Sequence, residues 1–248
     1  MDVNKNGYTF TFAAVMVVVV AALLSLAATS LKPFQQKNVS LEKKQSILAS
    51  IGVKVSREEA DEAYDKHITK ALVLKNGEEV DKLVAFDVEL SKEINKAPEE
   101  RNAPLYIAQK EGQEYYIIPM RGKGLWGPIW GYMALQGDVN TVYGATFDHK
   151  SETPGLGAEI STPIFMDQFQ GKKILDQEGK FVSIEVRKGD ASGDYQVDGI
   201  SGGTITSVGV QDMIQNSVKP YLDYLKSYSG DYQASRSGEN SNEVASIQ

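Results

Sequence analysis

The stretch Asp198-Gly199-Ile200-Ser201-Gly202-Gly203-Thr204-Ile205-Thr206-Ser207 carries the most information in this sequence. Gly202 and Gly203 permit unusual dihedral angles and a close approach to the backbone. A helix is expected to begin near Thr206, and the free N–H groups at a helix start favour a phosphate. The hydroxyls of this stretch add donors: Ser201, Thr204, Thr206 and Ser207. The stretch therefore suits an anion, although an ordinary loop and N-cap would have the same composition.

The helix expected after this stretch has apolar residues at steps of three and four. They are Val210, Met213, Ile214, Val218, Tyr221, Leu222 and Leu225. The preceding loop is not a nucleotide P-loop, because the Gly-x4-Gly-Lys-[Ser/Thr] pattern is absent and no lysine lies nearby.

Two other stretches are candidates for ligand contact. In Glu152-Thr153-Pro154-Gly155-Leu156-Gly157, a rigid proline and the glycines expose backbone N–H groups to a flat ligand, or form a plain turn. Gly124-Leu125-Trp126-Gly127, together with Trp130, offers a stacking surface for an aromatic ring, or simply packs in the core.

The composition narrows the function class. The 248 residues carry a formal net charge of -7, which argues against binding a phosphate backbone, so no nucleic-acid partner is expected. The chain has no cysteine, which excludes disulfides, zinc-thiolate sites and cysteine-ligated iron–sulfur clusters. Only two histidines are present, so no metal site is expected and redox chemistry would need an organic cofactor.

The N-terminal region reads as a membrane anchor over residues 1–34. The 24 residues from Tyr8 to Leu31 carry no charge and would form a helix of about 36 Å, longer than a hydrocarbon core of roughly 30 Å. A cleavable signal peptide is the alternative, but its apolar core is usually shorter. The lysines that follow the span would, taken alone, place the rest of the chain in the cytoplasm: Lys32, Lys37, Lys43 and Lys44.

The rest of the chain predicts an α+β protein. Residues 35–103 are expected to form a helical stalk, with one helix over Val39–Ile51 and a second, opened by a Ser56/Glu59 capping box, running through Lys70. Residues 104–228 are expected to form the main domain, with a short helix over Pro163–Phe169. Its expected strands are Leu105–Ala108, Tyr115–Met120, Ile129–Leu135, Val142–Phe147 and Phe181–Val186. Residues 229–248 are expected to be a disordered tail.

Taken together, these features resemble the FMN-binding domain family. The resemblance runs from the anchor, through the Gln45-Ser46-Ile47-Leu48 run of the stalk, to the Asp-Gly-x-Ser-Gly-x-Thr core within Val197–Gln211. In that family the last threonine of a Ser/Thr-Gly-Ala-Thr motif receives FMN from a flavin transferase. The resemblance implies a phosphoester at Thr204, with Thr206 as the fallback acceptor. This chain departs from the motif in having Gly203 where the family usually has alanine.

The resemblance also implies roles for individual residues, none of them catalytic. We expect Gly202, Gly203, Thr206 and Ser207 to hold the phosphate, and Asp198 to help present Thr204 to the transferase. Residues bordering the flavin ring would be Leu125, Trp126, Thr153, Gly155 and Leu156. Ser201, Glu152 and Gly157 complete the expected cofactor site. A literal Gly-Ala-Thr at 144–146 lacks the surrounding motif, so Thr146 is interpreted as structural.

The resemblance further implies one of the six subunits of a sodium-translocating NADH:quinone reductase in the bacterial inner membrane. It would relay electrons from NADH towards ubiquinone, with the FMN domain on the periplasmic side, against the lysine count. Alternatives are the homologous G subunit of an Rnf-type ferredoxin:NAD complex, a tethered binding domain without redox chemistry, and a purely structural assembly subunit.

Overall fold

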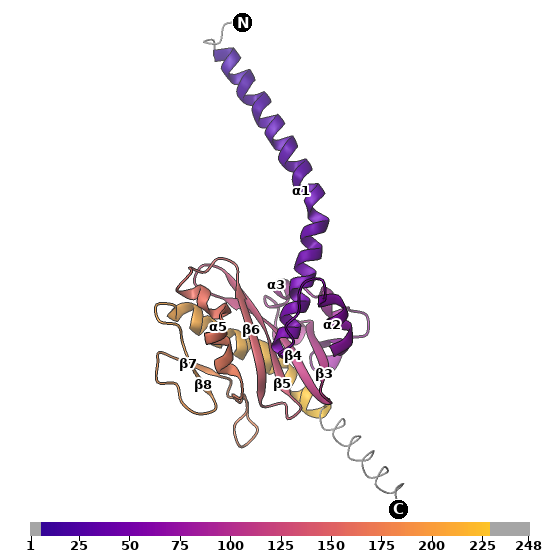
Figure 1. The fold of residues 1–248 in the computed structure, drawn as a ribbon, viewed down its shortest axis with the longest axis vertical. Helices are drawn as coiled ribbons and strands as arrows, with labels where there is room; N and C mark the ends of the chain where they lie inside the picture. Colours follow the sequence, from indigo (N-terminus) through magenta and orange to yellow (C-terminus); the bar gives the residue numbers. More distant parts are fainter. Residues whose placement is uncertain (1–5, 229–248) are drawn as a thin grey trace, which may run out of the picture. The chain divides into compact units, whose positions relative to one another are not determined.

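The computed structural model describes residues 6–228, which divide between Lys43 and Lys44 into two compact units. The tail expected over 229–248 lies outside the described residues. Most of the first unit belongs to helix α1 (Asn6–Ser50), which continues into the second (Figure 1). An 18-residue window of α1 has a mean hydropathy of 2.6, and 0% of that window is buried. Helix α1 is therefore long and apolar enough to cross a membrane, as expected.

The second unit is built on a six-stranded antiparallel sheet in the order β2-β1-β3-β4-β5-β6. Its strands alternate buried side chains between two faces, as the two-residue period of extended chain requires. The bounds are Ile68–Lys75 (β1), Glu78–Glu79 (β2), Ala103–Lys110 (β3), Gln113–Lys123 (β4), Pro128–Gln136 (β5) and Val142–His149 (β6).

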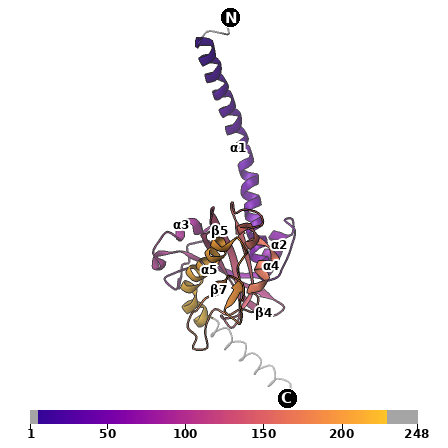
Figure 2. The ribbon, with the colours of Figure 1, turned by 90° about the vertical axis from the view of Figure 1, so that its left-hand side faces the viewer.

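Each face of the sheet has its own core. On one face, helix α5 (Thr204–Val218) packs with Ile118 and Met120 of β4, and the view turned by 90° shows α5 lying along the sheet (Figure 2). On the other, Ile47, Leu48 and Ile51 pack on Tyr106 and Ile117, beside helix α2 (Ala60–His67). The sheet is thus covered on both faces, which confirms the α+β class.

Two glycines allow α5 to lie unusually close to the end of β4. A Cβ at Gly209 would come within 2.4 Å of the Lys123 backbone oxygen, and a Cβ at Gly122 within 2.7 Å of Met213 Cβ. This close approach fixes the helix beside the segment that enters the 124–127 turn.

The remaining elements are short. A long segment between β6 and α5 holds η3 (Gly157–Ser161), α4 (Pro163–Met166), η4 (Asp167–Phe169) and the parallel pair β7 (Glu185–Arg187) and β8 (Gln196–Asp198). The others are η1 (Ala85–Asp87), α3 (Leu90–Glu93), η2 (Pro98–Glu100) and η5 (Lys219–Tyr221).

Four of the five expected strands and the helices over Val39–Ile51, Pro163–Phe169 and the C-terminal stretch are confirmed, the last beginning two residues early, at Thr204. The helix expected to run through Lys70 is wrong. It ends at His67, because Ile68–Lys75 pairs with β3 across the expected 103/104 boundary, so residues 35–103 also supply strands. Of the expected strand Phe181–Val186 only the end pairs in a sheet, since Ser183 has a φ of 64° that interrupts extended backbone.

Candidate functional site

Three loops meet around the buried carboxylate of Glu152, which is 5% exposed. Its Oε1 accepts a hydrogen bond from the Trp126 N–H at 2.8 Å, and its Oε2 accepts one from the Thr206 hydroxyl at 2.6 Å. The three stretches singled out in the sequence are therefore joined by one side chain. Hydrogen bonds to a buried charged group are among the stronger ones, so this junction fixes the loops firmly.

Two glycines leave the room that this carboxylate occupies. A Cβ at Gly124 would come within 2.5 Å of Glu152 Oε1. A Cβ at Gly157 would come within 2.5 Å of Oε2 and 2.6 Å of the Thr206 hydroxyl. The close packing around Glu152 requires glycine at both positions. Glu152 and Gly157 therefore hold the loops of the site together.

The loop before α5 is held in a tight conformation. Gly202 has a φ of 75°, in the left-handed region that favours glycine, and a Cβ there would lie 2.7 Å from Leu156 Cδ2. The Ser207 N–H donates to the Gly203 carbonyl at 2.9 Å as a first helical bond. By helix geometry, the N–H groups of residues 204 to 206 have no acceptor within the helix. The loop therefore presents donors to an anion.

The four hydroxyls of this loop differ in accessibility. Thr204, the first residue of α5, is exposed, and no hydrogen bond of its hydroxyl is found in the described part of the chain. Ser201 is also exposed, in the turn before the helix. Thr206 and Ser207 are both 1% exposed. The Ser207 hydroxyl donates to the Gly203 carbonyl and accepts from the Ile200 N–H at 2.9 Å.

The hydroxyls of Thr206 and Ser207 are thus engaged within the protein, which differs from the expectation that they face a phosphate. Both turn inward because α5 starts at Thr204, so residues 206 and 207 fall on the helix face that packs on the sheet domain. Thr206, the fallback acceptor, has no exposed hydroxyl in this conformation. Its backbone N–H remains at the helix start.

A cavity of about 370 Å³ lies beside Thr204. Gly199, Ser201, Thr204 and Val208 line it together with two cationic residues, Arg187 and Lys188. Arg187 is paired with Glu185 at 3.1 Å, and this carboxylate raises the Arg187 pKa further. Sequence reasoning missed both cations, because only the parallel pairing of β7 with β8 brings them to the loop.

The second part of the site is apolar and exposed. Trp126 is 67% exposed and Leu125 49%, so the alternative that they pack in the core is wrong. Leu156 is 41% exposed and contacts the Gly202 turn. Ile205 and Val208, exposed on the outer side of α5, were missed because a helical pattern alone does not say which apolar side chains face solvent.

The other expected residues lie around this surface. Thr153 is exposed, and Gly155, with a φ of 75°, donates its N–H to Glu159 at 2.9 Å. The Asp198 carboxylate accepts from the Ala191 N–H at 2.9 Å, so it orders the loop before β8 and does not touch Thr204 in this arrangement. Thr146 lies within β6, where its hydroxyl donates to the Ser46 carbonyl at 3.3 Å.

The residues present fit a flavin carrying a phosphate. They combine glycines whose missing Cβ atoms leave room, free N–H groups at a helix start, two nearby cations and an exposed tryptophan. Within residues 6–228, no group of three or more potential metal-ligating side chains occurs.

Comparisons with known proteins agree with this geometry. The family described as FMN-binding domain matches residues 124–219. The chain is 31% identical to the C subunit of the Na(+)-translocating NADH-quinone reductase of Haemophilus ducreyi, over 92% of this chain and 98% of that protein. It is 34% identical to the corresponding protein of Pseudomonas aeruginosa, over 85% and 91% of the two chains.

Two solved structures are also similar to this chain. The crystal structure of the Parabacteroides distasonis C subunit has a TM-score of 0.72 and 44% identity, covering 79% of this chain and 96% of that one. NqrC of Shewanella oneidensis, at 24% identity and a TM-score of 0.64 over 75% and 97% of the two chains, shares the fold. The chain therefore belongs to the NqrC family, the C subunits of the Na(+)-translocating NADH-quinone reductase, an oxidoreductase complex, and contains an FMN-binding domain.

Proposed function

We propose that this chain carries one FMN joined through its phosphate to Thr204, and that it serves as a fixed electron carrier. The observation that carries the proposal is the contrast between hydroxyls in one loop. Thr204 is exposed at the first position of a 15-residue helix, whereas Thr206 and Ser207 are buried and engaged. A flavin transferase could reach Thr204 without unfolding the loop.

The covalent step is a phosphoryl transfer. The Thr204 oxygen forms a bond to the phosphorus of an activated FMN donor held by the transferase. The donor's leaving group departs with the electrons of the broken P–O bond, and the hydroxyl proton is released. The product weighs as much as the protein plus FMN less one water. No oxidant or reductant is consumed.

The phosphate end of the site has support from several groups. The N–H groups at the start of α5 and the helix dipole favour a negative charge at this position. Gly202 and Gly203 let the loop fold tightly against Leu156 and Ile200, and Ser201 adds an exposed hydroxyl. Lys188 lines the adjacent cavity and would balance the charge that the phosphodiester keeps.

The ring end of the site would be formed by apolar surface. Leu125, Trp126 and Leu156 would border the ring, with Thr153 and Gly155 at its edge. Glu152 and Gly157 hold together the loops that contain Trp126 and Thr206. Asp198 orders the segment that precedes the attachment loop, which is residues 199–207. The bound flavin would supply the redox chemistry, while the chain supplies its position and surroundings.

The family supports the wider setting of this proposal. We infer a complex of six subunits in the bacterial inner membrane that passes electrons from NADH towards ubiquinone and exports sodium. Residues 1–34 would anchor the chain, and the sheet domain, to which residues 44–103 also belong, would hold the flavin on the periplasmic side. A large domain can be translocated despite flanking lysines. Protection from protease added to intact spheroplasts would contradict this orientation.

In-gel flavin fluorescence tests the attachment. The full chain is produced with its cognate transferase, denatured and examined under ultraviolet light. Wild type and Thr206→Ala should fluoresce, whereas Thr204→Ala should not. Fluorescence of denatured Thr204→Ala, with loss in Thr206→Ala, would move the ester to position 206 and contradict the proposal.

A further inference from the structure

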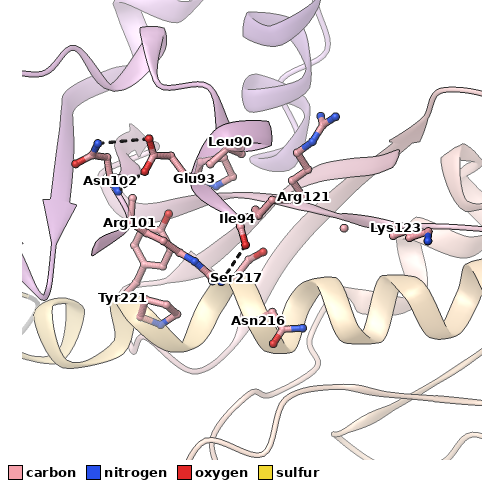
Figure 3. A pocket seen from close by; sticks show the side chains of 14 residues that line it. Leu90, Glu93, Ile94, Arg101, Asn102, Arg121, Lys123, Asn216, Ser217 and Tyr221 are labelled. Carbon is pink, nitrogen blue, oxygen red and sulfur yellow. Dashed lines mark hydrogen bonds between the residues drawn. The ribbon is translucent and has the colours of Figure 1, made fainter. Parts of the chain in front are cut away.

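A second cleft, of about 380 Å³, lies between the 90–103 segment, the end of β4 and the C-terminal part of α5 (Figure 3). It shares no lining residue with the cavity beside Thr204. Its volume is in the range of small-molecule sites. None of the roles described above involves it.

The guanidinium of Arg101 is fixed inside this cleft. Its Nε donates to the Lys96 carbonyl at 3.0 Å and its Nη2 donates to the Ile94 carbonyl at 3.1 Å. Arg101 is half-buried, and no carboxylate pairs with it among residues 6–228. Two backbone acceptors do not neutralise the charge, and they leave further donors of the planar fork without a partner.

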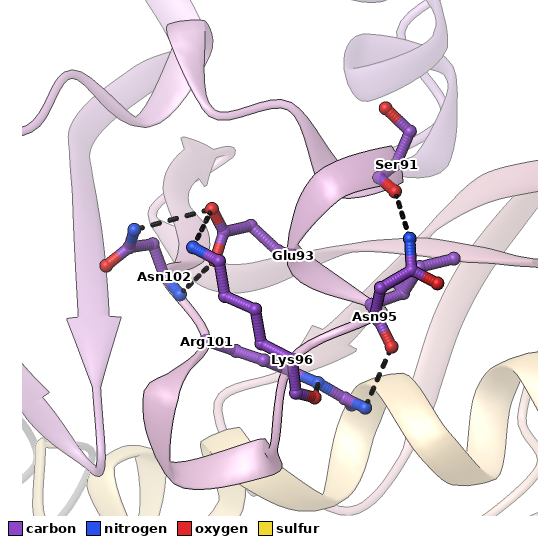
Figure 4. A network of polar contacts seen from close by, with 7 residues as sticks. Ser91, Glu93, Asn95, Lys96, Arg101 and Asn102 are labelled. Atoms are coloured by element: carbon purple, nitrogen blue, oxygen red, sulfur yellow. Dashed lines mark hydrogen bonds and ion pairs between the residues drawn. The ribbon is translucent and has the colours of Figure 1, made fainter.

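The one acid that lines the cleft is already neutralised. Both oxygens of Glu93 accept from the Lys96 ammonium at 2.8 Å, and one also accepts from the Asn102 N–H at 2.8 Å (Figure 4). Burial acts to raise the Glu93 pKa, but Lys96 and Asn102 together bring it below its usual value. Glu93 therefore stays charged and paired with Lys96, and it forms no ion pair with Arg101.

The rest of the lining supplies apolar walls. Arg121 and Lys123, from the end of β4, also line the cleft and form no ion pair in the described part of the chain. However, Arg121 lies over the Trp130 ring at 5.9 Å. The charged ends of Arg121 and Lys123 point away from Arg101 (Figure 3). The apolar surface comes from Leu90, Ile94, Pro119, Pro220 and Tyr221. A fixed guanidinium beside apolar walls suits a planar anionic group on a small apolar body, because the fork can bind two oxygens at once.

We propose that this cleft is a binding site for a small organic anion, with a carboxylate or phosphate on Arg101 and a single ring or short chain against the apolar walls. The inference is independent of the flavin attachment. It does not require Thr204 to be modified.

Calorimetric titration of the full chain in detergent tests this site, with benzoate and phenyl phosphate as probes. Benzoate and phenyl phosphate should each bind at one site per chain. Benzyl alcohol, which has the ring without the charge, should bind at least about tenfold more weakly, because it cannot form the charged hydrogen bonds to Arg101. Inorganic phosphate should also bind more weakly, because it leaves the apolar walls uncovered.

Variants assign the binding to the cleft. Arg101→Gln should weaken the binding of benzoate and of phenyl phosphate by about tenfold or more. Asn216→Trp fills the cleft from an exposed position on α5 and keeps Arg101, so it should also abolish binding without disturbing the Arg101 contacts. Arg57→Gln, at an exposed arginine outside the cleft, should bind as wild type does. Absence of binding to wild type, unchanged binding in either cleft variant, or equal binding of inorganic phosphate and phenyl phosphate would overturn the proposal.

Discussion

The Thr206 hydroxyl donates a 2.6 Å hydrogen bond to Glu152, a residue 54 positions earlier in the chain. The other oxygen of the same carboxylate holds the backbone of Trp126 at 2.8 Å. One buried charge therefore connects the start of α5, the loop after β6 and the turn between β4 and β5. The connection explains why a threonine two residues beyond the proposed attachment point is unavailable for modification.

Glu152→Ala should lower the free energy of unfolding by about 2–4 kcal/mol, because it leaves the part-buried Trp126 N–H and the buried Thr206 hydroxyl without their acceptor. Glu152→Gln should cost less, since the amide can still accept from Trp126. Chemical denaturation of the detergent-solubilised chain measures both. Glu159→Ala is the matched control, as its carboxylate accepts one N–H at a less buried position. Equal losses in the two alanine variants would refute the role assigned to Glu152.

Gly202 and Gly203 should respond differently to alanine. Gly202→Ala forces an L-residue to a φ of 75° and should cost about 1–2 kcal/mol of stability. Gly203 has an ordinary φ of -105°, and a Cβ there would lie 3.0 Å from Ile200 Cγ2, so Gly203→Ala needs only a small shift. We expect Gly203→Ala to fold and to accept FMN. Denaturation midpoints and flavin content measure the pair, and the reverse order of stabilities would contradict this reading of the loop.

Truncation should separate the anchor from the folded domain. A chain beginning at Gln35 should leave the membrane fraction and stay folded, since it keeps Ile47, Leu48 and Ile51. A chain beginning at Gly52 lacks these fully buried side chains, each of which contributes about 1.5–3 kcal/mol. It should aggregate or unfold at a lower denaturant concentration. Fractionation followed by circular dichroism checks both products, and a stable chain beginning at Gly52 would contradict the packing described.

Raising the pH above about 10 should lower the free energy of unfolding of the domain, because buried tyrosines resist ionisation in the folded state. Burial raises the pKa of Tyr64 to about 12, and burial also raises the pKa of Tyr106, Tyr132 and Tyr221. The folded state therefore favours the neutral phenols. This stability is fully present below about pH 10, the unfolded pKa, and is lost as the pH rises towards 12 and beyond.

Denaturation at pH 9 and pH 11, with phenolate absorbance recorded in parallel, measures this effect. Tyr132→Phe should lose less stability than wild type between the two values, because it removes one buried group that must ionise. Equal losses in the two proteins would argue against the burial of Tyr132 as the cause.

The sheet was largely predictable because its strands are short apolar runs bounded by glycine. Helix α5 was predictable because its buried residues recur at helical spacing. Strand β1 was not, since Ile68–Lys75 follows directly on α2 and takes its strand conformation from pairing with β3, more than thirty residues later. Tertiary pairing overrode the local signal there.

The candidate site could be predicted in pieces but not assembled. Each glycine-containing loop has a common local explanation, and nothing local indicates that Glu152 reaches both Trp126 and Thr206. The exposure of Trp126 and the approach of Lys188 to Thr204 also depend on the fold. Only the family resemblance pointed to Thr204 in advance, and the buried state of Thr206 now supports that choice independently.

Fragmentation mass spectrometry of the protein purified from its own membranes tests the central claim most directly. Trypsin should release residues 189–226 as one peptide, because Lys219 precedes a proline, and this peptide contains all four hydroxyls of the attachment loop. We predict that it carries the mass of FMN less one water, localised to Thr204. A peptide of unmodified mass, or the added mass on Ser201, Thr206 or Ser207, would contradict the account.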